Sequence, residues 1–240
     1  MMQIFWQMRG RLQKTAQRLR WEMNLKGKSE NEIRSAIRGL KNEIGRLKNI
    51  MEHPEYGSEP LIHPTEDVRI WCTRMYLDRA KQALLEMGAD YAPSQAELKA
   101  QQFQANIDYI KKIKFEIGGY FGGYEFYTIA VDDKHIHYDV GHSLILKPSN
   151  LPDTTDYPMS RAEFLDGFRE LYIGEWRHNY NPERFGYMFL DGTQWSLDIE
   201  YSNGVKTAHY YGSNSYPYNF DKLKELFGIE DNIDYEADEE

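Results

Sequence analysis

The segment H-I-H-Y-D, from His135 to Asp139, contains the residues best suited to metal chemistry. Alternate side chains of a β-strand point to the same face, so a strand here places His135, His137 and Asp139 together. Two imidazoles and a carboxylate form a ligand set for zinc, iron or manganese. Ile136 and Tyr138 supply an apolar side, however, so a strand with its polar side in solvent explains the same pattern. These are the candidate metal ligands, although neither a metal nor a cofactor is expected.

No established catalytic motif accompanies these residues. The sequence contains neither G-x-S-x-G nor H-E-x-x-H. The glycine-rich run from Gly118 to Gly123 lacks the lysine and the serine or threonine of a P-loop, and it lies between two predicted strands. The single cysteine, Cys72, excludes a disulfide within the chain and a zinc site built from cysteines. A non-enzymatic protein is favoured, and a metal-assisted hydrolase that uses the two histidines and Asp139 is the alternative.

Lysines and arginines at helical spacing form a second set of candidates. They share the flank of a predicted helix next to its apolar stripe, at Arg34, Arg38, Lys41 and Lys48. A similar stripe precedes it at Arg11, Lys14 and Arg18. Cations in such rows can follow the phosphates of a nucleic acid or bind an acidic protein surface. Because helices usually direct these side chains into water, a solvated face is the other interpretation.

Aromatic and amide residues near the C-terminal end form a third set. Five of them could line a pocket for a peptide or a small ligand: Trp176, Tyr180, Trp195, Asn214 and Tyr216. The scaffold interpretation is favoured over this one. In it, Trp195 anchors one face of a sheet and Asn214 hydrogen-bonds within a loop that Pro217 stiffens.

Amphipathic helices must position the cationic side chains. Apolar residues recur every three or four positions from Phe5 to Met23 and predict a first helix. A capping box of Ser29 and Glu32 opens a second helix, in which Ile33 to Met51 keep a heptad spacing. The short break at Gly27 favours an antiparallel hairpin of these two helices. Two further helices are expected, at 65–87 and 95–104.

Strands follow the helices along the chain. Alternating apolar residues, or runs of β-branched and aromatic residues, predict strands at 110–117, 124–131, 135–140, 195–201 and 205–211. Helices are expected after a capping box at Ser160 and Glu163, and again over 219–227. The strands come as hairpins and not as β-α-β units. The predicted fold class is therefore α+β, with an all-α helical hairpin module followed by an α+β domain whose sheet is mainly antiparallel.

The distribution of charged residues along the sequence also predicts two domains. The sequence holds 29 Lys and Arg against 38 Asp and Glu, a net charge of −9, but residues 1–50 hold 12 against 4. We expect a basic helical module over 1–108, an acidic, aromatic-rich α+β domain over 109–228 and an acidic tail over 229–240. No apolar run approaches the roughly 20 residues of a membrane span, so a cytoplasmic protein without membrane contact is expected.

Three motifs in the second domain resemble a recurrent bacterial domain of unknown function. They are W-x-x-x-Y from Trp176, L-D-G-T-Q-W-S-L from Leu190 and G-S-N-S-Y-P-x-N-F from Gly212, within residues of roughly 110–228. The resemblance implies kinship and carries no activity to transfer. The helical half looks like companions of that domain in proteins of mobile elements.

These patterns predict a binding protein and not an enzyme. Its basic helices would engage a nucleic acid or a nucleoprotein enzyme, as an accessory factor of a mobile element or an inhibitor of a host defence nuclease. A structural or oligomerisation module is a further alternative, in which the seam from Ile33 to Met51 pairs between chains. Self-association is therefore left open by the sequence.

Overall fold

By its internal contacts, the chain divides into two units, Met1–Ala92 and Pro93–Glu240. The computed structural model describes residues 25, 27–58, 60, 63–132, 135–143 and 155–229, with only the backbone of 155 and 156. The predicted first helix, with Arg11, Lys14 and Arg18, lies outside the described residues, as does the acidic tail after Ile229.

The observed division comes earlier than the predicted boundary near residue 108. Helix α4 (Gln95–Asn106) follows the division and so belongs to the second unit. Its Phe103 is buried in the same apolar core as the sheet, together with Ile107. The charge pattern could not reveal this, because α4 carries few charges of either sign.

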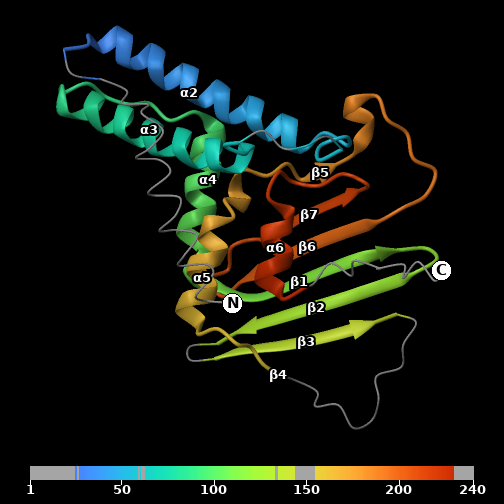
Figure 1. Cartoon of the computed structure of the whole chain (residues 1–240). Helices are drawn as coiled ribbons and strands as arrows, with labels where there is room; N and C mark the ends of the chain where they lie inside the picture. The colour runs from blue at the N-terminus through green and yellow to red at the C-terminus, as the bar shows by residue number, and fades with distance from the viewer. Residues whose placement is uncertain are drawn as a thin grey trace. The chain divides into compact units, whose positions relative to one another are not determined.

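The first unit contains an antiparallel pair of helices, α2 (Glu30–Met51) and α3 (Glu66–Glu86) (Figure 1). The predicted capping box of α2 is present. The Glu32 carboxylate accepts hydrogen bonds from the Ser29 hydroxyl at 2.7 Å and from its backbone N–H at 2.8 Å. These hydrogen bonds lower the pKa of Glu32, because they favour the ionised carboxylate.

The heptad seam of α2 is covered by α3. One buried cluster joins the two helices and comprises Ile33, Ile37, Ile44, Leu77, Ala80 and Leu84. The hairpin partner expected from the sequence, the helix over 5–23, lies outside the described residues, and the described hairpin joins α2 to α3. Ile33, Ile37, Ile44 and Leu47 of the seam are thus buried within one chain, whereas Leu40 and Met51 are half-buried. Pairing of the seam between chains stays a prediction.

A seven-stranded sheet forms the second unit, in the order β4-β3-β2-β1-β6-β7-β5 (Figure 1). The strands are β1 (Ile110–Gly119), β2 (Gly123–Val131), β3 (Ile136–His142), β4 (Thr155–Asp156), β5 (Asn179–Tyr180), β6 (Gln194–Tyr201) and β7 (Ala208–Ser213). All neighbours pair antiparallel except β5 and β7. The predicted α+β class with a mainly antiparallel sheet is confirmed.

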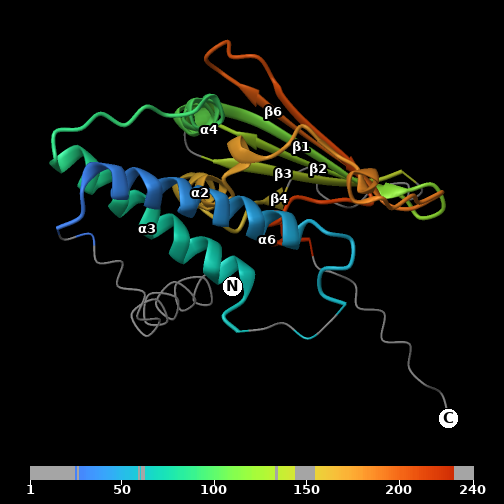
Figure 2. The same ribbon diagram turned by 90° about the horizontal axis from the view of Figure 1, so that it is seen from above.

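Helices α5 (Arg161–Glu170) and α6 (Phe220–Phe227) pack on one face of the twisted sheet (Figure 2). The ring of Phe115 in β1 lies 5.5 Å from that of Phe227 in α6, and Tyr157 contacts Phe164 of α5 at the same ring distance. Short 3₁₀ turns are η1 (Ile107–Tyr109), η2 (Ile173–Glu175) and η3 (Pro182–Phe185). Among the helices of the described residues, none is long and apolar enough to cross a membrane.

Alternation along β1 separates the two faces of the sheet. Ile113 and Phe115 are buried, and each lies between buried apolar residues of β2 and β6. The residues that alternate with these buried ones along each strand point to the other side of the sheet, which we call the open face. Its members are half-buried or exposed, and include Lys114, Glu116, Tyr124, Phe126, Gln194, Ser196, Asp198, Glu200, His209 and Tyr211.

Phe115 should contribute far more to stability than an exposed phenylalanine of the same unit. Replacing Phe115, which is 1% exposed, by alanine should lower the free energy of unfolding by about 3–5 kcal/mol, because a cavity forms beside α6. Phe121→Ala is the matched control, and the exposure of this side chain should keep its effect within about 0.5 kcal/mol. Urea unfolding measures both variants, and equal losses would contradict this assignment of the core.

Candidate ligand-binding pocket

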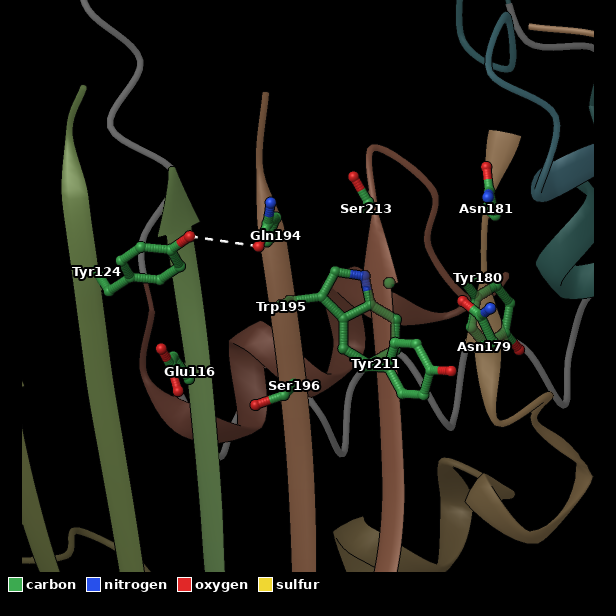
Figure 3. Close-up of a pocket in the computed structure, with 11 residues that line it drawn as sticks. Glu116, Tyr124, Asn179, Tyr180, Asn181, Gln194, Trp195, Ser196, Tyr211 and Ser213 are labelled. Carbon is green, nitrogen blue, oxygen red and sulfur yellow. Dashed lines mark hydrogen bonds between the residues drawn. The ribbon is translucent and has the colours of Figure 1, made fainter. Parts of the chain in front are cut away.

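A concave pocket of about 450 Å³ lies on the open face of the sheet (Figure 3). It is found where β6 begins and where β1 and β7 end. Its lining comprises Glu116, Tyr124, Asn179, Tyr180, Asn181, Gln194, Trp195, Ser196, Tyr211, Gly212 and Ser213. A volume of this size is within the usual range of ligand sites in proteins.

The strand register arranges these residues as a polar floor with a tyrosine on each side. Glu116 of β1 lies opposite Ser196 of β6, which lies opposite Tyr211 of β7. Tyr124 belongs to β2, on the other side of β1, and its hydroxyl donates a hydrogen bond to Gln194 Oε1 at 3.3 Å (Figure 3). Ring faces, hydroxyls and amides are therefore all presented within one concavity.

Glu116 is the one charged side chain among the described lining residues. In the part of the chain that the structure describes, no residue forms a hydrogen bond or an ion pair with its carboxylate. Other carboxylates of the open face are paired. Lys114 contacts Glu200 at 3.2 Å and lowers the pKa of that carboxyl, and Asp198 pairs with His209. Glu116 is thus a half-buried anion in the concavity, open to a ligand.

The segment after Trp176 forms the far wall. Strand β5 pairs in parallel with β7, and the backbone N–H of Tyr211 donates to the carbonyl of His178 at 3.0 Å. This pairing places Asn179 and Asn181 beside the pocket, where Asn181 Oδ1 accepts a hydrogen bond from a backbone N–H of η3 at 3.0 Å. The wall therefore offers amide donors and acceptors to a ligand.

Large apolar side chains are exposed at one end of the pocket. We call them the apolar rim: Tyr120, Phe121, Met188, Phe189 and Leu190, with exposed fractions of 84, 81, 79, 49 and 100%. The two segments that carry them meet, because a Cβ atom on Gly119 would lie 2.8 Å from the carbonyl oxygen of Gly192. Both lie at the same end of the sheet (Figure 1). Contiguous exposed apolar groups mark interaction sites on soluble proteins.

Three of the aromatic pocket candidates form a cluster in the core of the second unit. Trp176, Tyr180 and Trp195 are buried, and the ring of Trp195 lies 6.3 Å from that of Trp176 and 5.7 Å from that of Tyr180. Each indole has a hydrogen-bond acceptor, at 3.0 Å on Asn219 for Trp176 and at 2.9 Å on the Ser215 carbonyl for Trp195. Tyr180 and Trp195 contribute to the lining of the observed pocket, whereas Trp176 does not.

Asn214 and Tyr216 hold the scaffold together. Asn214 has a left-handed backbone, with φ at 48°, and its side chain accepts from the Thr193 N–H at 2.9 Å and donates to the Asp191 carbonyl at 3.1 Å. It therefore ties the end of β7 to the segment before β6. Tyr216 packs on Phe220 of α6 at a ring distance of 4.8 Å. Neither residue lines the pocket.

The candidate metal ligands do not converge. The backbone N–H of His135 donates to Asp132 Oδ1 at 2.6 Å, and His137 Nε2 lies 3.1 Å from Asp132 Oδ2. The carboxylate beside the histidines is therefore that of Asp132, while Asp139 follows on β3. Within the described residues, no three His, Cys, Asp or Glu side chains are placed to hold a metal ion.

The candidate cations of α2 are partly engaged within the first unit. Arg34 donates to the carboxylate of Glu30 at 2.7 Å and to the carbonyl of Asp90 at 2.9 Å. Lys41 contacts the Tyr91 hydroxyl at 3.4 Å. These cations are therefore already used in part to hold α2 to its own unit.

The remaining two candidates of α2 differ in exposure. Arg38 is exposed and Lys48 is half-buried. The surrounding charge is balanced, because residues 25–92 hold 11 Lys and Arg and 11 Asp and Glu. Half of the excess of positive charge in residues 1–50 lies in residues 25–50, with seven basic and three acidic residues. The other half lies in residues 1–24, with five basic residues and one acidic residue, outside the described part.

Comparisons with protein-family models, with curated proteins and with solved structures find no match to this chain. The resemblance to a bacterial domain of unknown function therefore stays a prediction.

Sequence patterns do not single out Glu116, Tyr124 or Tyr211. These residues lie on the polar side of amphipathic strands, where residue type and spacing are the same for a pocket wall and for a solvated face. One signal does exist in the sequence. Tyr120 and Phe121 are adjacent aromatic residues in a turn between glycines, a place where aromatic side chains have no core to enter.

Asn214→Ala should lower the free energy of unfolding by about 1–3 kcal/mol, because the Thr193 N–H loses its acceptor and alanine disfavours the left-handed conformation. Asn214→Gly loses the same hydrogen bonds but tolerates the backbone, so its loss should be smaller than that of the alanine variant. Urea unfolding of the two variants separates these causes. A glycine variant less stable than the alanine variant would contradict the role given to the backbone of Asn214.

Proposed function

We propose that this protein is a non-enzymatic binding protein that docks a protein partner on the pocket and the apolar rim. The observation that carries the proposal is the exposure of Tyr120, Phe121, Met188 and Leu190 beside a concave site. Complete burial of a large apolar side chain contributes about 1.5–3 kcal/mol, so a partner that covers the rim gains several such contributions.

Charge favours a protein over a nucleic acid at this surface. Residues 93–240 hold 13 Lys and Arg against 26 Asp and Glu, and a field of this sign repels phosphates. The charged residue in the pocket itself is also an acid, Glu116. A protein partner with apolar and basic groups is complementary to both features.

The lining of the pocket suits recognition better than catalysis. Among the described lining residues there is no histidine, lysine or cysteine, and no hydrogen bond pairs the one carboxylate, Glu116, with a hydroxyl of the lining. Acid–base and nucleophilic mechanisms need such a pair within hydrogen-bond reach. Amides, hydroxyls and tyrosine rings are instead the groups that orient a bound ligand.

Selection of phage-displayed random peptides on the full chain tests this proposal. Peptides that compete for one site should bind the variant Phe121→Ser/Leu190→Ser at least tenfold more weakly, because the apolar contact is lost. Leu85→Ser is the matched control, since Leu85 is also exposed but lies on α3, and it should leave the affinity unchanged. Selected peptides that bind the rim variant and the control equally would contradict the proposal.

A second candidate is contact with a nucleic acid or a nucleoprotein through the flank of α2. The exposed Arg38, with Lys41 and Lys48 on the same flank, supports it. An accessory factor of a mobile element or an inhibitor of a nuclease would have such a contact. Residues 25–50 hold seven Lys and Arg against three Asp and Glu, and residues 1–24 add five against one.

Arg38→Glu should weaken binding to DNA or RNA if this flank contacts phosphates. The loss should be at least about tenfold at low salt, and the slope of affinity against salt should fall by about 1, because one phosphate contact is removed. Arg79→Glu makes the same change at an exposed position of α3 and serves as the control. Gel-shift titrations over a salt series give both quantities, and equal affinities for the wild type and the two variants would eliminate this second candidate.

A further inference from the structure

We propose that the pocket binds a basic side chain of the partner, preferably arginine, with the guanidinium at Glu116. This inference rests on the proposed function and adds the chemistry of the group that the site recognises. It places an arginine beside an apolar residue in the bound segment, because the pocket and the apolar rim adjoin.

The state of the Glu116 carboxylate favours a positively charged ligand group. It lies half-buried in a concave site, and no described residue is hydrogen-bonded or ion-paired to it. Nearby acids of the same face have partners of their own, because Glu200 contacts the Lys114 ammonium and Asp198 contacts the His209 ring. A carboxylate in partial shelter from water gains more from a cation than an exposed one does. The pocket is therefore electrostatically complementary to a cation and disfavours an anion.

Further hydrogen-bond acceptors lie around Glu116. Ser196 lies opposite it on β6, and Gln194 Oε1 faces the same concavity, where it accepts from Tyr124. An arginine has five N–H donors in a planar fork, which several acceptors in different directions can satisfy. A lysine ammonium is a compact donor and leaves more of these acceptors unused. The acceptor set therefore favours arginine.

The tyrosines of the pocket are also placed to contact an arginine and the segment that carries it. Tyr124 lies one strand from Glu116, and its ring offers a face on which a guanidinium can stack (Figure 3). Tyr211 lies on the far side of β6, so about three strand spacings of ~4.8 Å separate β2 from β7. That width accommodates more than one side chain. Tyr211 and Asn179 can thus contact the segment that carries the arginine.

The test uses three peptides that differ at one position: N-acetyl-Leu-Xaa-Leu-amide with arginine, lysine or citrulline, an uncharged shape mimic of arginine. Binding to the ¹⁵N-labelled full chain is followed by amide chemical shifts. The arginine peptide should shift the amides of Glu116, Ser196 and Tyr211, and the citrulline peptide should bind at least about tenfold more weakly. Lysine should give an intermediate affinity.

Variants assign the effect to the pocket. E116Q should lower the affinity for the arginine peptide about tenfold and leave that for the citrulline peptide unchanged. E200Q, which makes the same charge change on the same face outside the pocket, should alter neither. Tyr124→Leu should weaken binding of the arginine peptide, and Tyr124→Phe should restore it, because phenylalanine keeps the ring face.

Three results would overturn this inference: no binding of the arginine peptide, equal binding of the citrulline peptide, or equal losses for E116Q and E200Q. A different result would contradict the proposed function: selected peptides that bind the rim variant Phe121→Ser/Leu190→Ser as tightly as they bind the control. A surface that binds peptides through the rim without preference for arginine would therefore refute the inference and leave the proposed function standing. Unchanged amide spectra of the free variants verify that each one is folded.

Discussion

Pairing of β1 on both of its edges is the constraint on which the second unit depends. Phe115 and Glu116 are neighbours in sequence, but alternation sends the first into the core against α6 and the second into the pocket. A slip of one residue against β2 and β6 would exchange them and bury a carboxylate without a partner, at a cost of several kcal/mol. The apolar core therefore also fixes the chemistry of the open face.

Close backbone contacts place the apolar rim next to the pocket. A Cβ atom on Gly118 would lie 2.1 Å from the carbonyl oxygen of Gly123, so the tight β1–β2 turn requires glycine there. Gly119 and Gly192 let this turn approach the segment before β6, which Asn214 ties to β7. The rim is thus held in place although its side chains have no core to enter.

Sequence patterns predict the elements of this fold well and its site poorly. Capping boxes at Ser94 and Ser160 and the alternation from Trp195 to Tyr201 act locally, so α4, α5 and β6 form where they are expected. Such local patterns do not predict which distant segments pair. The apolar seam of α2, for example, does not indicate that α3 is the helix that covers it. Large aromatic residues such as Trp176 fit either a scaffold or a pocket by type, and Trp176 is buried in the core. The role of Glu116 depends on a register that only the folded sheet defines.

The proposed function and the alternative on α2 differ in the surface that binds the partner. Amide chemical-shift mapping of the ¹⁵N-labelled full chain with a selected peptide measures it directly. The shifts should concentrate at Glu116, Ser196 and Tyr211 and in the segments that carry the apolar rim. Shifts confined to the flank of α2 around Arg38, with none in the pocket, would contradict the proposed function.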